Sequence, residues 1–180
     1  MALLHQATIS PTKLELVTDY LDSVPWGGTG EVELIGGYRF DDPAGEVGVE
    51  ALLASRDGRT LHIPLTYRGT PLAGADEYLI STMAHSVLGD RWIYDAAADP
   101  VAVDCFVRAM RGEQPQAELE VRKADGTVVP LDSPVRLQVH GTPGETAALA
   151  LSDDLASPVS GSAWLVAEWD GGHGVVAALR

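Results

Sequence analysis

The stretch RFDDPAGEVGVE, residues 39–50, decides how the chain folds. It places four carboxylates within ten positions, on Asp41, Asp42, Glu46 and Glu50. Two interpretations are open, a catalytic or metal-binding cluster and a turn between two strands with charged ends. The tetrapeptide DPAG at residues 42–45 has Asp, Pro and Gly where a type I turn favours them. The carboxylates also lack the D-x-[DN]-x-[DN]-G spacing of a calcium loop. The sequence therefore predicts a turn.

A hairpin closed at this turn predicts a register. It pairs Asp41 with Glu46, Phe40 with Val47, Tyr38 with Val49 and Leu34 with Leu53, which puts the apolar side chains on one face. Arg39 then points to the opposite face, diagonal to Glu46 and Glu50. Exposed pairs of this kind contribute only about 0.2–1 kcal/mol. Because residues 42–45 are expected to form a hairpin turn and not a metal site, Asp42→Asn should have little effect on stability.

Composition limits the function more than any motif does. The chain has 180 residues, a hydrophobic fraction of 46% and a net charge of −14. Such an acidic protein repels nucleic-acid phosphates and anionic membranes, so neither is an expected partner. No segment reaches the roughly 18–20 apolar residues of a membrane span, and the first residues lack the pattern of a signal peptide. With a single cysteine, Cys105, the chain is expected to be cytoplasmic.

Two segments are predicted to be helices. Ser10 and Pro11 resemble a capping hydroxyl followed by proline at the first helical position, and Leu14, Val17 and Leu21 follow at helical spacing. The second helix begins at Asp99-Pro100 and ends at Gly112. Its apolar positions, all expected to be buried, are Ala102, Cys105, Phe106, Ala109 and Met110.

Most of the remaining chain alternates like β-strands. Leu61, Ile63, Leu65 and Tyr67 would share one face, with His62, Thr66 and Arg68 on the other, and Pro64 indicates an edge strand or a bulge. The dipeptides Asp57-Gly58 and Asp125-Gly126 predict hairpins, and a last hairpin is expected between residues 163–169 and 174–179. Residues 141–160 are loop-like, with a short strand possible at 147–151. Several hairpins and two helices predict one α+β domain on an antiparallel sheet.

Recognisable catalytic chemistry is largely missing from the sequence. The chain has no asparagine, no phosphate-binding loop and no zinc-type histidine spacing, so we expect no cofactor, no metal and no catalytic residue. We also expect no binding or hydrolysis of ATP. The least favoured alternative is an unrecognised hydrolase that uses Asp41, Glu46 and His85.

One segment is rich in aromatic and polar residues, HSVLGDRWIYDA at residues 85–96. Arginine and tryptophan are frequent anchors of binding sites, although Trp92 and Tyr94 are also typical of a packed core. If the chain binds a ligand or partner, Arg39 and Arg68 on one sheet face would attract an anionic or hydroxyl-rich group. The candidate binding residues are Arg39, Arg68, His85, Arg91, Trp92 and Asp95.

Four phrases in the same order carry a family resemblance: ISPTKLEL at residues 9–16, YRFDDPAGEVGVE at 38–50, IPLTYRGTPLAGA at 63–75 and HSVLGDRWIYDAAADP at 85–100. Together they resemble the N-terminal cap domain of actinobacterial maltokinases and its stand-alone relatives. The resemblance covers residues 1–111, and residues 112–180 would add further hairpins to a single cap-like domain.

The resemblance implies a cystatin-like fold, in which a curved antiparallel sheet packs against two principal helices. Maltokinases phosphorylate maltose with ATP on a separate kinase body, for which this chain has no matching residues. The resemblance therefore implies a non-catalytic interaction or regulatory module, with a sugar kinase or another α-glucan or trehalose enzyme as its partner. The alternative is a protein that binds a sugar or sugar phosphate on the concave sheet face.

Overall fold

The fold is described from a computed structural model, which covers residues 2–5, 7–122, 125–144 and 148–180. Its central element is a curled antiparallel sheet that we call the half-barrel. The strand order in this sheet is β2-β6-β7-β5-β4-β3. In chain order these strands are β2 (Ile9–Ser10), β3 (Val32–Asp41), β4 (Gly48–Arg56), β5 (Arg59–Arg68), β6 (Leu79–His85) and β7 (Gly89–Asp95).

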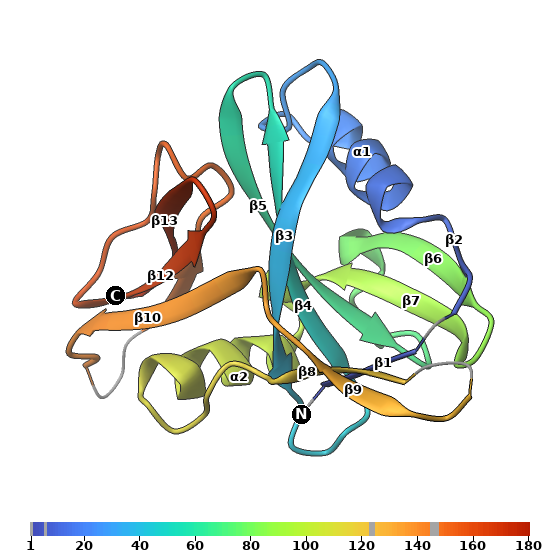
Figure 1. The fold of residues 1–180 in the computed structure, drawn as a ribbon. Coiled ribbons are helices and arrows are strands. Elements are labelled where there is room, and N and C mark those ends of the chain that lie inside the picture. Colours follow the sequence, from blue (N-terminus) through green and yellow to red (C-terminus); the bar gives the residue numbers. More distant parts are fainter. Residues whose placement is uncertain (1, 6, 123–124, 145–147) are drawn as a thin grey trace.

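Helix α1 (Lys13–Ser23) packs on one face of the half-barrel, which we call the α1 face. Figure 1 shows the helix between the β3–β5 strands and the β6–β7 strands, so the sheet curls around it. The helix was predicted correctly, but its N-cap was not. Thr12 forms a capping box with Glu15, and Leu14, which was expected on the apolar stripe, is 46% exposed.

Helix α2 (Pro100–Met110) covers the opposite side, the α2 face. Asp99 caps it and Pro100 is its first residue, as the sequence predicts, and all five expected core positions are buried. Short 3₁₀ turns, η1 (Asp76–Tyr78) and η2 (Ala96–Ala98), lie in the connections on either side of the β6–β7 hairpin. No helix in the described residues is both long and apolar enough to cross a lipid bilayer.

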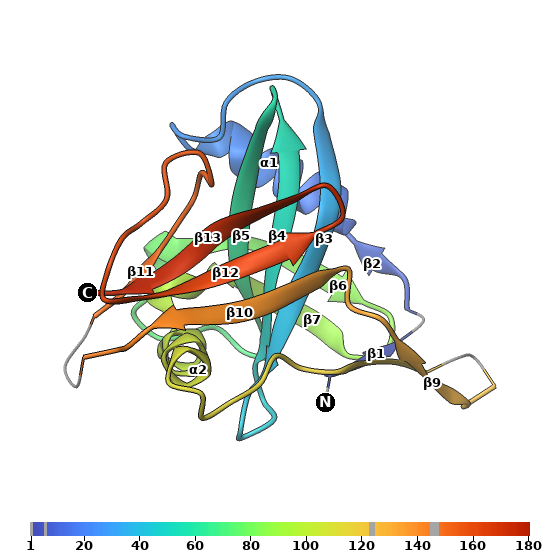
Figure 2. The same cartoon turned by 60° about the vertical axis from the view of Figure 1, so that its left-hand side comes forward.

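The C-terminal part of the chain builds a second antiparallel sheet, with the strand order β10-β12-β13-β11. Its strands are β10 (Val135–Gly141), β11 (Leu149–Leu151), β12 (Ala163–Trp169) and β13 (Gly172–Leu179). Figure 2 shows this sheet lying across β3–β5, with α2 beside it. The last hairpin was predicted correctly, with a tighter turn at Asp170-Gly171. A short strand was also expected at residues 147–151. Residues 149–151 form β11, and residue 147 lies outside the described residues.

A small third sheet joins the chain's beginning to its middle, in the order β1-β8-β9. Strand β1 (Ala2–His5) runs parallel to β8 (Leu119–Arg122), which pairs antiparallel with β9 (Val128–Leu131). The predicted hairpins at Asp57-Gly58 and Asp125-Gly126 both form, and positive φ angles of 51° at Asp57 and 72° at Gly58 match the tight turn.

The hairpin of the opening stretch forms, but with a register two residues away from the predicted one. Phe40 pairs with Val49 instead of Val47, and Asp41 pairs with Gly48. The amide of Gly45 does donate to the carbonyl of Asp42 at 2.9 Å, as in a type I turn. The Asp42 carboxylate also accepts from the amides of Glu46 and Val47 at 2.9 Å each, and these bonds draw both residues into the loop.

Both faces of the half-barrel are buried, so apolar side chains do not mark a single face, and the strand pairing decides which residues share one. Strand β4 is buried continuously from Val49 to Ala54, because α1 covers one face and α2 with the second sheet covers the other. Arg39 pairs with Glu50, which pairs with Leu65, so Arg39 lies on the α1 face with Leu65 and Tyr67. Arg68 lies on the α2 face. The predicted pair of arginines on one sheet face is therefore wrong.

Candidate functional site

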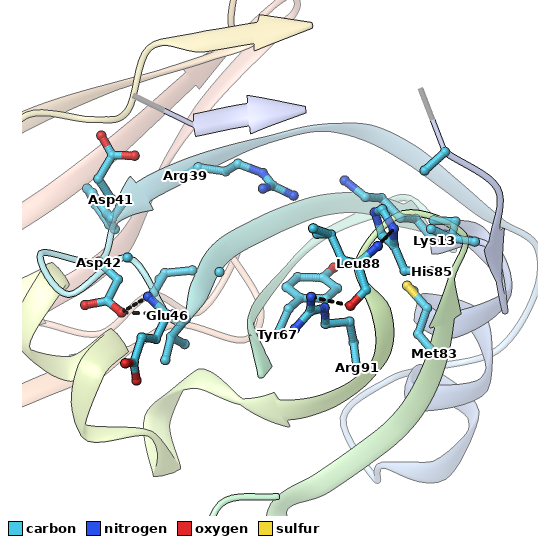
Figure 3. A pocket seen from close by; sticks show the side chains of 17 residues that line it. Lys13, Arg39, Asp41, Asp42, Glu46, Tyr67, Met83, His85, Leu88 and Arg91 are labelled. Atoms are coloured by element: carbon cyan, nitrogen blue, oxygen red, sulfur yellow. Dashed lines mark hydrogen bonds between the residues drawn. The ribbon is translucent and has the colours of Figure 1, made fainter. Parts of the chain in front are cut away.

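A pocket of about 730 Å³ opens on the α1 face of the half-barrel. Its wall comes from the start of α1, the β3–β4 hairpin, the end of β5 and the β6–β7 hairpin, as Figure 3 shows. Volumes of this order are typical of small-molecule sites. The polar part of the wall includes the side chains of Lys13, Arg39, Tyr67, His85 and Arg91.

Glu50 binds two of the basic side chains of this pocket, Lys13 and Arg39. Its side chain is buried, and its Oε1 atom accepts from Nζ of Lys13 at 2.6 Å and from Nε of Arg39 at 3.1 Å. Its other oxygen, Oε2, accepts from the hydroxyl of Tyr67 at 2.9 Å. Because two cations bind one oxygen atom, the ammonium and guanidinium groups are held side by side, and Figure 3 shows the end of Arg39 pointing toward Lys13.

The charges around Glu50 fix its protonation state. Burial by itself raises the pKa of this carboxyl, but Arg39 and Lys13 outweigh burial and hold the pKa at about 2, against an ordinary value of 4.5. Burial and the nearby Glu50 carboxylate raise the pKa of Tyr67. The phenol therefore stays protonated and donates to Glu50. The expectation that Glu50 forms an exposed pair of little energetic weight is wrong, because the side chain is only 6% exposed.

Arg91 lines the pocket from β7. Its Nη2 donates to the carbonyl of Leu88 at 2.6 Å, which ties the side chain to the β6–β7 turn. Its Nε is buried and has no hydrogen-bond partner among the described residues. In the same turn, Nδ1 of His85 accepts from the amides of Val87 and Leu88 at 3.2 and 3.1 Å. His85 is therefore oriented by the backbone of this turn.

The opposite end of the pocket is acidic. Asp41, Asp42 and Glu46 lie there, away from Lys13 and Arg91 in Figure 3. Burial tends to raise the pKa of Asp42, but three backbone amide bonds lower it below its ordinary value. Among the described residues no group of three or more His, Cys, Asp and Glu side chains could hold a metal ion. His85 is at the far end from Asp41 and Glu46, so the hydrolase alternative gains no assembled triad.

The structure divides the six predicted binding residues into two sets. Arg39, His85 and Arg91 line the pocket. Arg68 lies outside it and forms a two-bond ion pair with the buried Asp99 side chain, at 2.7 Å for each bond. Trp92 pairs with Arg68 across the strands, away from the pocket. Asp95 caps η2 by accepting from the amide of Ala97 at 2.8 Å. Arg68 and Asp95 therefore serve structural contacts.

Among the polar side chains of the pocket, sequence reasoning missed Lys13 and Tyr67. Tyr67 was expected to be buried, whereas it is half-buried, lines the pocket and donates its hydroxyl to Glu50. Lys13 carries one weak signal, because it is one of only two lysines in the chain. Its proximity to Glu50 depends on how α1 docks on the sheet, and no local pattern encodes that docking.

The half-barrel also contains the part of the chain that matches a family model. Residues 20–99 match the family model of the maltokinase N-terminal cap domain. This segment extends from the last turn of α1 through β3–β7 to the N-cap of α2, and so includes most of the curled sheet. The matched segment is shorter than residues 1–111, over which the sequence resemblance was expected, and the phrase at residues 9–16 lies outside the match. No curated protein and no solved structure matches the chain.

Proposed function

We propose that this chain is a non-catalytic cap-type interaction or regulatory module, whose partner is a sugar kinase or another enzyme of maltose, trehalose or α-glucan metabolism. The observation that carries the proposal is the match of residues 20–99 to a domain described as the N-terminal cap of maltokinases. The matched segment includes strands β3–β7 of the half-barrel, whose two faces pack into separate apolar clusters, one with Leu53 and one with Ile63. A cap of this kind acts by contact with an enzyme, without supplying the reacting groups.

The proposal is tested with a purified maltokinase as the partner. Sedimentation or biolayer interferometry measures whether the two proteins associate, and a coupled assay measures the rate of maltose phosphorylation with and without this chain. We expect saturable association together with a change in that rate. If neither quantity responds over the micromolar range, and the same holds for enzymes of trehalose and α-glucan conversion, the proposal is wrong.

Two exposed apolar side chains provide a matched comparison. Leu88, 47% exposed, lies within the matched segment, and Trp164, 38% exposed, lies outside it on the second sheet. If the cap-like half-barrel makes the contact, Leu88→Ser weakens association and Trp164→Ser does not. The reverse result would place the contact on the C-terminal sheet and would contradict a cap-type role.

A further inference from the structure

The pocket on the α1 face concentrates positive charge in a strongly acidic protein. Lys13, Arg39 and Arg91 contribute three cations, and the buried Glu50 contributes one anion, which leaves this end with an excess of two positive charges. The whole chain has a net charge of −14. Anions are therefore repelled by most of the surface, and this cluster, whose cations come from three separate elements, is a local exception.

Glu50 positions Lys13 and Arg39, and its single negative charge does not cancel their two positive charges. A buried ion pair stabilises a fold little more than apolar side chains of similar volume would. Here the carboxylate binds Arg39 through Nε, so the outer end of the guanidinium extends into the pocket beside Lys13. The ammonium and guanidinium groups are thus oriented before any ligand arrives, which lowers the entropic cost of binding.

Arg91 completes the cluster with unused hydrogen-bonding capacity. Its buried Nε has no partner among the residues that the structure describes, although a buried donor of this kind is normally satisfied. Its position is set by close packing, because a Cβ atom on Gly69 would lie 2.8 Å from its Nη1. Arg91 therefore has a donor that its bond to the carbonyl of Leu88 does not use.

The remaining wall of the pocket indicates what is attached to the anion. Away from the cations lie the carboxylates of Asp41 and Glu46, which accept hydrogen bonds from hydroxyl groups and repel a second anion. Met83 and Leu88 add apolar atoms to the wall, which a carbon skeleton could contact. The pocket is thus polarised, with one end suited to an anion and the other to hydroxyl groups.

We propose that this pocket binds a sugar phosphate, with its phosphate between Lys13, Arg39 and Arg91 and its hydroxyl groups toward Asp41 and Glu46. A phosphate monoester carries about two negative charges near neutral pH, which matches the local excess, whereas a carboxylate carries one. Guanidinium groups are also well suited to phosphate oxygens. The inference does not depend on the proposed partner enzyme, since the pocket lies within this chain.

Isothermal titration calorimetry with glucose 6-phosphate, glucose and inorganic phosphate tests the inference. We expect saturable binding of glucose 6-phosphate, at least about tenfold weaker binding of inorganic phosphate, and no measurable binding of glucose. Raising the salt concentration should weaken the binding. Absence of glucose 6-phosphate binding at millimolar concentration would overturn the inference. Equal affinity for inorganic phosphate would overturn the assignment of the acidic end to hydroxyl groups.

Matched variants locate the site. Arg91→Gln should raise the Kd for glucose 6-phosphate at least about tenfold. Arg136→Gln makes the same charge change on the exposed β10 strand and should alter the Kd less than about twofold. Gly69→Ala leaves every charge in place and displaces the Arg91 guanidinium, so it should also weaken binding.

The melting temperatures of the three variants show whether each is folded. If Arg91→Gln does not fold, Gly69→Ala still tests whether the pocket is the binding site. Unchanged binding in both pocket variants, or an equal loss in Arg136→Gln, would show that the pocket is not the site. Association with a partner enzyme is measured separately. If the chain binds glucose 6-phosphate but associates with no partner enzyme, only the proposed function is contradicted. If it associates with a partner enzyme but does not bind glucose 6-phosphate, only this inference is contradicted.

Discussion

Replacing Glu50 with glutamine tests whether the ion pairs under the pocket stabilise the fold. The substitution keeps the size of the side chain and removes its charge, so that it imitates the protonated acid. The pKa of Glu50 is about 2 in the folded protein and 4.5 ordinarily. The difference corresponds to about 3 kcal/mol of stability that only the charged form provides. We expect Glu50→Gln to lower the free energy of unfolding by about this amount at pH 7.

The pH dependence gives this prediction its sign. Since folding lowers the pKa of Glu50, its contribution is complete above pH 4.5 and is lost as the pH falls toward 2. Urea unfolding of both proteins at pH 7, 5, 4 and 3 measures the difference in unfolding free energy between them. That difference should be constant above about pH 5 and should have shrunk by about 2 kcal/mol at pH 3.

The matched control is Glu46→Gln, four positions earlier on the same hairpin, where the side chain is exposed. It should change stability by less than about 0.5 kcal/mol. In a chain of charge −14, removal of any carboxylate relieves repulsion, which by itself stabilises the fold. A loss of stability confined to Glu50→Gln therefore reports its ion pairs. A difference from wild type below about 1 kcal/mol, or one that does not vary with pH, would refute the reasoning.

Four further predictions concern other parts of the chain. Arg68→Ala should lower the urea-unfolding free energy by about 3–5 kcal/mol, because it leaves the buried Asp99 carboxylate unpaired. Burial lowers the pKa of His62 to about 4 from 6.5, so wild type should lose about 3 kcal/mol between pH 6.5 and 4, whereas His62→Gln should show a flatter profile over that interval. Asp42→Asn should cost about 1 kcal/mol through weakened amide bonds, and added Mg²⁺, Ca²⁺ or Mn²⁺ should not raise the melting temperature of either protein. Calorimetry with ATP and magnesium, with maltose and glucosamine as acceptors, should detect neither micromolar binding nor phosphoryl transfer.

Local features of the fold could be predicted from the sequence because short-range chemistry decides them. The Asp57-Gly58 turn and the Asp99-Pro100 helix start each depend on neighbouring residues alone, and both form as predicted. The cap of the first helix shows the limit. Ser10 and Thr12 are both capping residues, and the reciprocal bonds with Glu15 favour Thr12.

The register of the β3–β4 hairpin was predicted wrongly because of local hydrogen bonds made by the Asp42 side chain. A four-residue turn would end at Gly45, whereas the Asp42 carboxylate binds the amides of Glu46 and Val47 and extends the loop. The shift is by two residues, so the predicted faces of Phe40 and Tyr38 remained correct. A shift by one residue would have placed every side chain on the wrong face.

The two-sided burial of the half-barrel could not be predicted from alternation, because β4 does not alternate. Its run from Val49 to Ala54 is buried throughout, as is typical of a strand covered on both faces. The covering sheet comes from strands β10–β13, far away in the chain. Without it, Arg39 and Arg68 seem to share a solvent face, whereas one lines the pocket and the other pairs with Asp99.

The pocket itself required the same long-range information. The sequence identified Arg39, His85 and Arg91 as candidates, but it missed the role of Glu50, which binds Arg39 and Lys13 and was first interpreted as a charged strand end. Its burial follows from the docking of α1, which brings Lys13 within 2.6 Å of a carboxylate on β4. A surface carboxylate would be free to screen the arginine from any ligand, whereas a buried one with both oxygens engaged holds its cations in place. Two of the four carboxylates that suggested a metal site therefore have separate roles: Asp42 shapes the turn, and Glu50 orients Lys13 and Arg39 at the pocket.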